Sequence, residues 1–273
     1  MTEADIALST VRESRHSQSG KLTPVRSSIW MLFSVAAILV AATALGMAIY
    51  ALCSLVFGVT EVRLAIGQVG AYPIKAMSKA PGHVQTLFFV LLSVLFFCLA
   101  APVFGAAIVA ARRNWRERLA MRPFTLRPGM IAAIALFVAM PVYLIGASFA
   151  IRFVDPTFTT WFFVPPHATG LALSFLGVAI MAPLAEELLF RGWIQTGLLK
   201  GFRPATAILI TTLLFALAHF NGSMLYPAAI FIPGLTLALV RQWTGSVWAS
   251  FAAHAVYNAW AWVLMLIIGK DLV

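Results

Sequence analysis

The chain consists of long apolar runs, and its charged residues are confined to the short stretches between them. Apolar residues fill 62% of the 273 positions and charged residues only 10%, and the mean hydropathy is +0.94. Soluble domains carry about 45–50% apolar and about 25% charged residues. A helix at a water-facing surface also needs a polar face, which most of these runs lack. The pattern excludes a soluble globular protein and predicts an all-α bundle of membrane-spanning helices.

A spanning helix needs about 20 apolar residues, because each residue advances the helix by about 1.5 Å. The runs predict a polytopic transmembrane bundle of about seven helices around a buried polar cavity. The expected helices cover residues 29–59, 84–111, 130–151, 171–199, 205–220, 226–240 and 247–268. Residues 1–27 are predicted to be a disordered cytosolic tail, and residues 28–273 the transmembrane domain. Residues 61–82 are either an extracytosolic loop or a helix on the membrane surface.

The positions of the cations predict the orientation in the membrane. They cluster after the second, fourth and sixth expected helices, on the side that the positive-inside rule assigns to the cytosol. These residues are Arg112, Arg113, Arg116, Arg118, Arg122, Arg127, Lys200, Arg203 and Arg241. We therefore expect a cytosolic N-terminus and an extracytosolic C-terminus. Topology accounts for the net charge of +10, so no nucleic-acid partner is expected. The short chain without appended domains favours a bacterial inner membrane.

Ionisable residues inside membrane helices are costly, and each needs a structural or functional reason. Glu187 and Arg191 lie four residues apart in the favourable order, which predicts an ion pair on one helix face. Glu186 points about 100° away from Glu187 on the same helix. It is thus left as an unpaired carboxylate, which suits a general base. The alternative is a polar clasp that only joins helices.

Two further helices carry polar residues at helical spacing. His219 follows Phe215 by four residues near the end of its helix, where it could also be an interfacial residue. His254 and Asn258 lie one turn apart on one helix face. They could hold a developing oxyanion or join two helices by a hydrogen bond, and the sequence leaves both options open. Counting about 1.5 Å per residue puts Glu186, His219 and His254 in the cytosolic third of the bilayer, where we expect them to converge.

In chain order, Glu-Glu-x-x-x-Arg, Phe-x-x-x-His and His-x-x-x-Asn on three membrane helices resemble the CPBP family. This family includes the type II CAAX prenyl endopeptidases and bacterial bacteriocin-processing and immunity proteins. The resemblance covers residues 171–260, the expected catalytic core. It implies an intramembrane endopeptidase acting near the cytosolic face on a peptide or protein, with a prenylated C-terminus as one option. By the same resemblance, water is activated by Glu186 and His219, the oxyanion is stabilised by His254 and Asn258, and the site is supported by Glu187, Arg191 and Phe215.

The metal requirement stays open at the sequence level. Members of the family are often labelled metalloproteases, and Glu186, His219 and His254 are the candidate ligands if zinc or another divalent metal binds. There is no His-Glu-x-x-His pair, and Glu187 is committed to Arg191. We therefore favour a water activated by glutamate and histidine without a required metal. The other histidines, His16, His83 and His167, are expected to be solvated.

Two other functions are compatible with a bundle of this kind. A non-catalytic membrane scaffold or immunity protein would use the cavity to bind a partner, and a proton-coupled transporter would use the buried Glu and His residues as a relay. The sequence has no recognisable inverted repeats or paired broken helices, which argues against a transporter. An intact set of four polar residues in the three motifs favours an enzyme over a scaffold. The expected partners are membrane lipid and the substrate.

Overall fold

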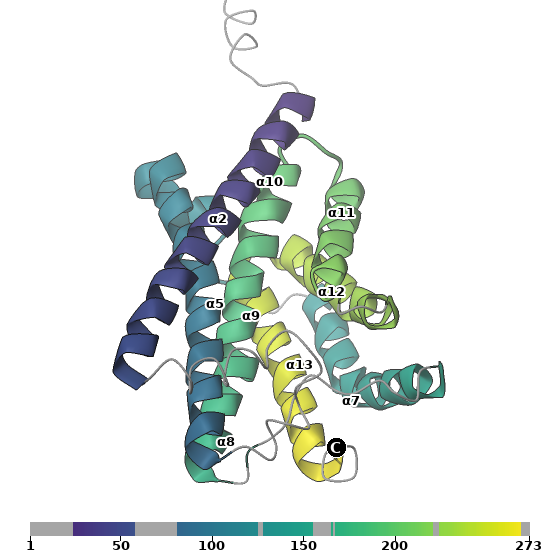
Figure 1. Cartoon of the computed structure of the whole chain (residues 1–273). Helices are drawn as coiled ribbons and strands as arrows, with labels where there is room; N and C mark the ends of the chain where they lie inside the picture. The colour runs from purple at the N-terminus through teal and green to yellow at the C-terminus, as the bar shows by residue number, and fades with distance from the viewer. Residues whose placement is uncertain are drawn as a thin grey trace, which may run out of the picture.

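The computed structural model describes residues 24–57, 81–124, 128–154, 165, 167–220 and 224–268. Within these ranges the chain is a bundle of helices without strands, which confirms the predicted fold class (Figure 1). The helices are α2 (Pro24–Phe57), α5 (Gly82–Ala111), α7 (Pro128–Val154), a continuous helix from Ala168 to Leu198, α11 (Pro204–Leu217), α12 (Leu225–Thr244) and α13 (Val247–Ile268). Most of the predicted tail and of the 61–82 stretch lies outside the described residues.

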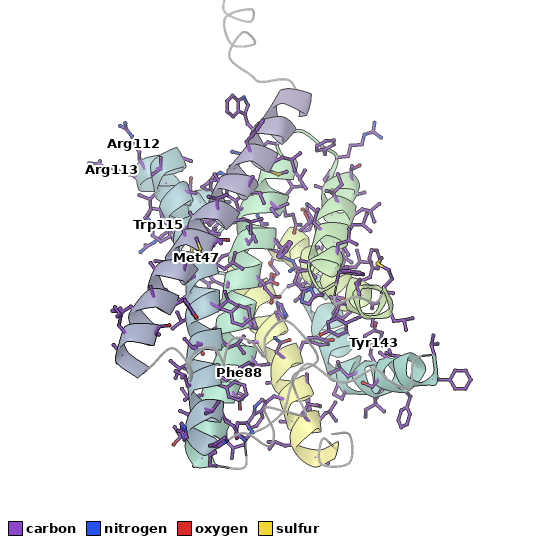
Figure 2. The ribbon with its side chains drawn as sticks, in the orientation of Figure 1. Met47, Phe88, Arg112, Arg113, Trp115 and Tyr143 are labelled. Carbon is purple, nitrogen blue, oxygen red and sulfur yellow. The ribbon has the colours of Figure 1, made fainter. Side chains whose placement is uncertain are left out.

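Five of the described helices are long and apolar enough to cross a membrane. These spans are Trp30–Val56, Gly82–Arg118, Ala168–Leu198, Leu225–Thr244 and Val247–Ile267. The 14 residues of α11 reach only about 21 Å, less than the roughly 30 Å of hydrocarbon. Large apolar side chains cover the outside of the bundle, as lipid contact requires, whereas Arg112 and Arg113 project at the end of α5 (Figure 2). The protein is an integral membrane protein.

The helix of residues 168–198, here called the central rod, is not uniform. Two π-helical stretches, η2 (Leu176–Met181) and η3 (Leu188–Gln195), lie between α8 (Ala168–Phe175), α9 (Ala182–Glu187) and α10 (Thr196–Leu198). A π turn holds more residues than an α turn and therefore rotates the faces that follow it. Such stretches occur frequently at functional sites. Here they flank the short α-helical segment that ends at Glu187.

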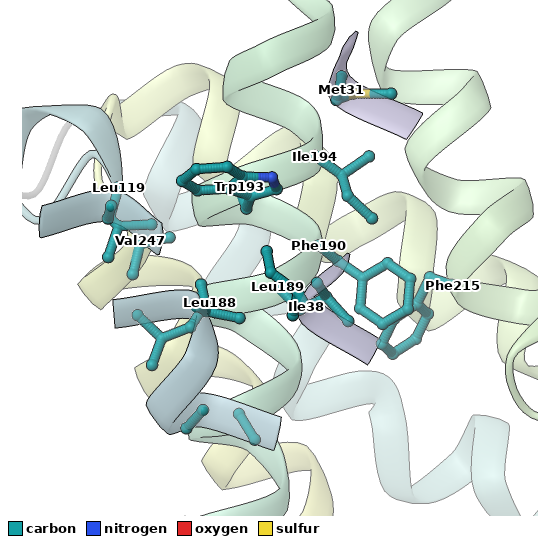
Figure 3. Packing of buried hydrophobic residues seen from close by; sticks show 14 of the residues in the cluster. Met31, Ile38, Leu119, Leu188, Leu189, Phe190, Trp193, Ile194, Phe215 and Val247 are labelled. Atoms are coloured by element: carbon teal, nitrogen blue, oxygen red, sulfur yellow. The ribbon is translucent and has the colours of Figure 1, made fainter. Parts of the chain in front are cut away.

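The main hydrophobic core surrounds η3, all eight residues of which are buried. Its apolar side chains pack against residues from α2, α11 and α13 and from the segment after α5 (Figure 3). The labelled members of this cluster are Met31, Ile38, Leu119, Leu188, Leu189, Phe190, Trp193, Ile194, Phe215 and Val247. This part of the central rod is thus enclosed by the other helices, so the polar residues of η3 face protein rather than lipid.

A tight turn sets α13 beside the central rod. Gly245 directly follows the end of α12, and its φ of 67° lies in the left-handed region that glycine adopts without strain. The Gly245 N–H donates to the carbonyl of Arg241, and the next helix begins two residues later at Val247. The backbone N–H of Val247 donates to the carbonyl of Ala120 at 3.0 Å, which ties this turn to the segment after α5. The turn therefore fixes the start of the helix that carries His254.

Candidate active site

Glu187 and Arg191 form the ion pair that their spacing predicted. Arg191 Nη1 lies 2.8 Å from Glu187 Oε1, and both side chains are fully buried. Arg191 Nη2 donates to the carbonyl of Gly234 at 2.9 Å, and the guanidinium carbon lies 4.2 Å from the ring centroid of Phe215. Buried charges are tolerated when they are paired and hydrogen-bonded. The pair therefore ties the central rod to α11 and α12.

Glu187 also contacts α13, which sequence reasoning missed. Its Oε2 accepts a hydrogen bond from Ser250, and its Oε1 lies 2.9 Å from Nδ1 of His254. Because a carboxylate only accepts hydrogen bonds, Nδ1 of His254 carries the proton. Nε2, on the other side of the ring, faces Glu186. The sequence did contain one signal for this contact, because Ser250 precedes His254 by four residues and therefore shares its helix face.

Glu186 has very different surroundings from Glu187. Its side chain is 15% exposed, and its Oε2 has no hydrogen-bond partner in the described part of the chain. This oxygen lies 3.9 Å from Nε2 of His219 and 3.8 Å from Nε2 of His254. Both distances exceed that of a direct hydrogen bond. The predicted convergence of these three residues from three helices is therefore present.

His219 is oriented by its own helix. Its Nδ1 lies 2.8 Å from the backbone carbonyl of Phe215, so Nδ1 carries a proton and Nε2 faces Glu186. The Phe215 ring packs against both imidazoles, with centroids 4.7 Å from His219 and 5.8 Å from His254. Phe215 also makes an edge contact with Phe190 in the core. The aromatic side chain thus holds the two histidines and Arg191 in one packed group.

The side chain of Asn258 makes no hydrogen bond to Glu186, His219 or His254 in the described part of the chain. Its Nδ2 donates to the carbonyl of Val178 in η2 at 2.8 Å, so it joins α13 to the central rod. A side-chain amide has two N–H donors, and this bond uses one of them. The structure adds Tyr226, at the start of α12, whose ring centroid lies 6.1 Å from that of His219. No spacing in the sequence pointed to this tyrosine.

The carboxylate of Glu186 and the imidazoles of His219 and His254 are ligand types that bind zinc in proteins. Catalytic zinc takes three protein ligands at about 2.0–2.2 Å, and metal-bound histidines usually donate their other N–H to a carbonyl or carboxylate. Both imidazoles have such a partner on Nδ1. Among the described residues, however, no group of three His, Cys, Asp or Glu side chains is arranged closely enough to hold a metal ion.

The histidines expected to be solvated differ from one another. His83 is exposed, and His16 lies outside the described residues. The prediction is wrong for His167, which is half-buried and caps α8 by accepting a hydrogen bond from the N–H of Gly170 at 2.9 Å. The first N–H groups of a helix have no partner within it, so a side-chain acceptor just before the helix stabilises its start.

Comparisons with known proteins agree with the motifs. Residues 168–260 match the family model described as type II CAAX prenyl endopeptidase Rce1-like. An uncharacterized 24.3 kDa protein of Escherichia coli is 32% identical over 134 residues, which cover 46% of this chain and 58% of that relative. The chain thus spans little more than half the length of this relative. No solved structure matches the chain significantly. The matched segment contains Glu186, His219 and His254, so residues 168–260 of this chain are similar to the Rce1-like, type II CAAX prenyl endopeptidase family.

Proposed function

We propose that the protein is an intramembrane endopeptidase that hydrolyses a peptide bond with a water molecule activated by Glu186 and His219. One observation carries this proposal: the unpartnered Oε2 of Glu186 lies within 4 Å of the Nε2 atoms of both His219 and His254. A carboxylate with neighbouring imidazoles can remove a proton from water and later deliver it to a leaving group. The site is also largely shielded from solvent, which strengthens electrostatic interactions within it.

The proposed reaction begins with water held between Glu186 and His219. Glu186 takes a proton from the water as its oxygen bonds to the carbonyl carbon of the substrate. The carbonyl oxygen becomes an oxyanion, which a protonated Nε2 of His254 stabilises as a hydrogen-bond donor. The Glu187 carboxylate on Nδ1 holds that ring in place and balances its charge, as the buried aspartate of a serine protease does for its histidine. The C–N bond then breaks, and the proton that Glu186 took from the water passes through His219 to the leaving amine.

Asn258 is proposed as the second oxyanion donor, because one of its two amide N–H bonds is not used by the contact with Val178. A divalent metal, if the protein binds one, would be held by Glu186, His219 and His254. It would supply Lewis-acid chemistry and lower the pKa of a bound water. We favour a reaction without a required metal, since Glu187 is committed to Arg191 and Ser250 rather than to a metal.

We further propose a bacterial inner-membrane location with a cytosolic N-terminus and an extracytosolic C-terminus. The basic residues between the helices support this orientation through the positive-inside rule. The active site then opens toward the cytosolic leaflet. A peptide or protein with a lipid-modified C-terminus is the first substrate to test, since the CPBP family includes enzymes that act on such chains.

The test is cleavage by the purified full-length protein in detergent, with a fluorogenic farnesylated CAAX peptide and its unprenylated twin. We expect the wild type to cleave, and His219→Ala to lose about 10²–10⁴-fold in kcat/KM because it lacks the proton-transfer group. His83→Ala is the matched control, because His83 is exposed, and it should cleave like the wild type. Wild-type cleavage should survive a chelator, and loss that zinc restores would establish a metal requirement. Equal cleavage by His219→Ala and the wild type would contradict the proposal.

A further inference from the structure

Arg241 is a buried arginine whose charge has no carboxylate in contact. It lies one turn before the end of α12 and is 6% exposed. Its Nη2 donates to the hydroxyl of Thr196 at 3.1 Å, and its Nε has no hydrogen-bond partner in the described part of the chain. None of the ion pairs among the described residues includes it. Buried charges are normally paired, so this guanidinium is an exception that needs a partner.

The charges around Arg241 do not supply that partner. Its neighbour Arg122 has the same sign and is exposed. Glu187 attracts Arg241 at longer range, but its two oxygens already contact Arg191, Ser250 and His254. The backbone carbonyl of Arg122 accepts a hydrogen bond from Ser246, which holds the Arg122 backbone beside the turn between α12 and α13. The buried Arg241, whose Nε has no hydrogen-bond partner among the described residues, and the neighbouring exposed Arg122 together supply two positive charges for an anion.

The position of this site indicates the kind of anion. α12 ends three residues after Arg241, and a basic segment follows the end of α5. In that segment Arg118 stacks on Trp193 at 4.1 Å, leaves Nη1 without a hydrogen-bond partner, and lies close to Lys200. Basic pockets at the ends of membrane helices lie at the depth of lipid headgroups and bind their phosphates. The guanidinium fork suits two oxygens of one phosphate.

A substrate carboxylate fits this position less well than a lipid phosphate. Thr196, the hydrogen-bond partner of Arg241, lies ten residues along the central rod from Glu186, which is roughly 15 Å. Three extended residues after a cleaved bond reach only about 10 Å. We propose that Arg241, together with Arg122, binds the phosphate of an anionic phospholipid headgroup. This lipid site does not depend on hydrolysis at Glu186.

The experiment measures lipid binding by the full-length protein in a neutral detergent, by native mass spectrometry and by the shift in Tm. The probes are phosphatidylglycerol, phosphatidylcholine with the same acyl chains, and inorganic phosphate. We expect saturable binding of phosphatidylglycerol that is tighter than binding of phosphatidylcholine. Arg241→Gln should weaken it at least about tenfold, because a charge-assisted hydrogen bond is lost. The matched control, Arg203→Gln, removes an exposed charge from the neighbouring loop and should leave the affinity within about twofold, as exposed charges contribute little.

Arg122→Gln keeps the experiment decisive if Arg241→Gln does not fold. Arg122 is exposed, so its replacement should leave the fold intact and weaken phosphatidylglycerol binding more than Arg203→Gln does. Inorganic phosphate that competes weakly with the lipid would support the shared phosphate chemistry. Phosphatidylglycerol binding unchanged in Arg241→Gln or Arg122→Gln would overturn the proposal. The proposal would also be overturned if phosphatidylcholine bound as tightly as phosphatidylglycerol. It would be overturned as well if inorganic phosphate bound the site in preference to either lipid.

Discussion

Glu186 and Glu187 are neighbours in the chain and opposites in their surroundings. Glu187 is fully buried and contacts Arg191, Ser250 and His254. Glu186 is partly exposed, and the oxygen that faces the two histidines has no hydrogen-bond partner among the described residues. Adjacent helical residues point about 100° apart, so one turn can place one carboxylate in the protein interior and the other in the site.

In the proposed function, this difference separates a structural role for Glu187 from a chemical role for Glu186. A carboxylate with every oxygen in use holds helices together, and its replacement should mainly affect folding. A carboxylate without a fixed partner contributes little to stability, but it is available to react. The next three predictions test the structural side of this comparison, and the closing measurement tests the chemical side.

Glu187→Gln is expected to lower the free energy of unfolding by about 3–5 kcal/mol, because it leaves Arg191 buried without a countercharge. Thermal unfolding in detergent measures the loss. Glu186→Gln is the matched control in the adjacent position, and it should lose much less stability, because Oε2 of Glu186 has no hydrogen-bond partner among the described residues. Equal losses in the two variants would remove the distinction between the glutamates.

Ser250→Ala is expected to lose about 1.5–3 kcal/mol, because it leaves Oε2 of the buried Glu187 without its hydrogen-bond donor. Ser93→Ala is the control. Ser93 donates only to the carbonyl of Phe89 in its own helix, so its loss should cost less than about 1 kcal/mol. Thermal unfolding of both variants gives the comparison. A larger loss in Ser93→Ala would show that Glu187 does not need the hydroxyl.

Gly234→Ala is expected to cost about 1–2 kcal/mol through overpacking, although alanine normally favours a helix over glycine. A Cβ at this position would lie 2.8 Å from Cδ1 of Phe215, the ring on which Arg191 and both histidines pack. Gly105→Ala is the matched control in α5, where no atom lies within 4 Å, and it should be neutral or stabilising. A stabilised Gly234→Ala would mean that the Phe215 ring moves freely.

Residue spacing predicted the parts of the fold and site that lie within single helices. The apolar runs predicted the helices to within a few residues, and the four-residue spacing predicted the ion pair of Glu187 and Arg191. Both follow from the period of one helix. Counting residues from the membrane surface also predicted that Glu186, His219 and His254 converge.

Contacts between helices could not be predicted in the same way. The bond from Ser250 to Glu187 depends on how α13 is rotated against the central rod, and two π-helical stretches alter that rotation without a clear sequence signal. The positive-inside rule accounted for Arg241 as a marker of topology. It could not reveal that this arginine is buried with only Thr196 as its hydrogen-bond partner.

The central claim is that Glu186 does chemistry while Glu187 holds the structure. Its most direct test is the rate of farnesylated peptide cleavage by Glu186→Gln, with the Tm measured on the same sample. Gln keeps the shape of the side chain but removes its ability to take a proton. The account predicts a Tm like that of the wild type and a loss of about 10²–10⁴-fold in kcat/KM. Cleavage by Glu186→Gln at the wild-type rate would contradict the account.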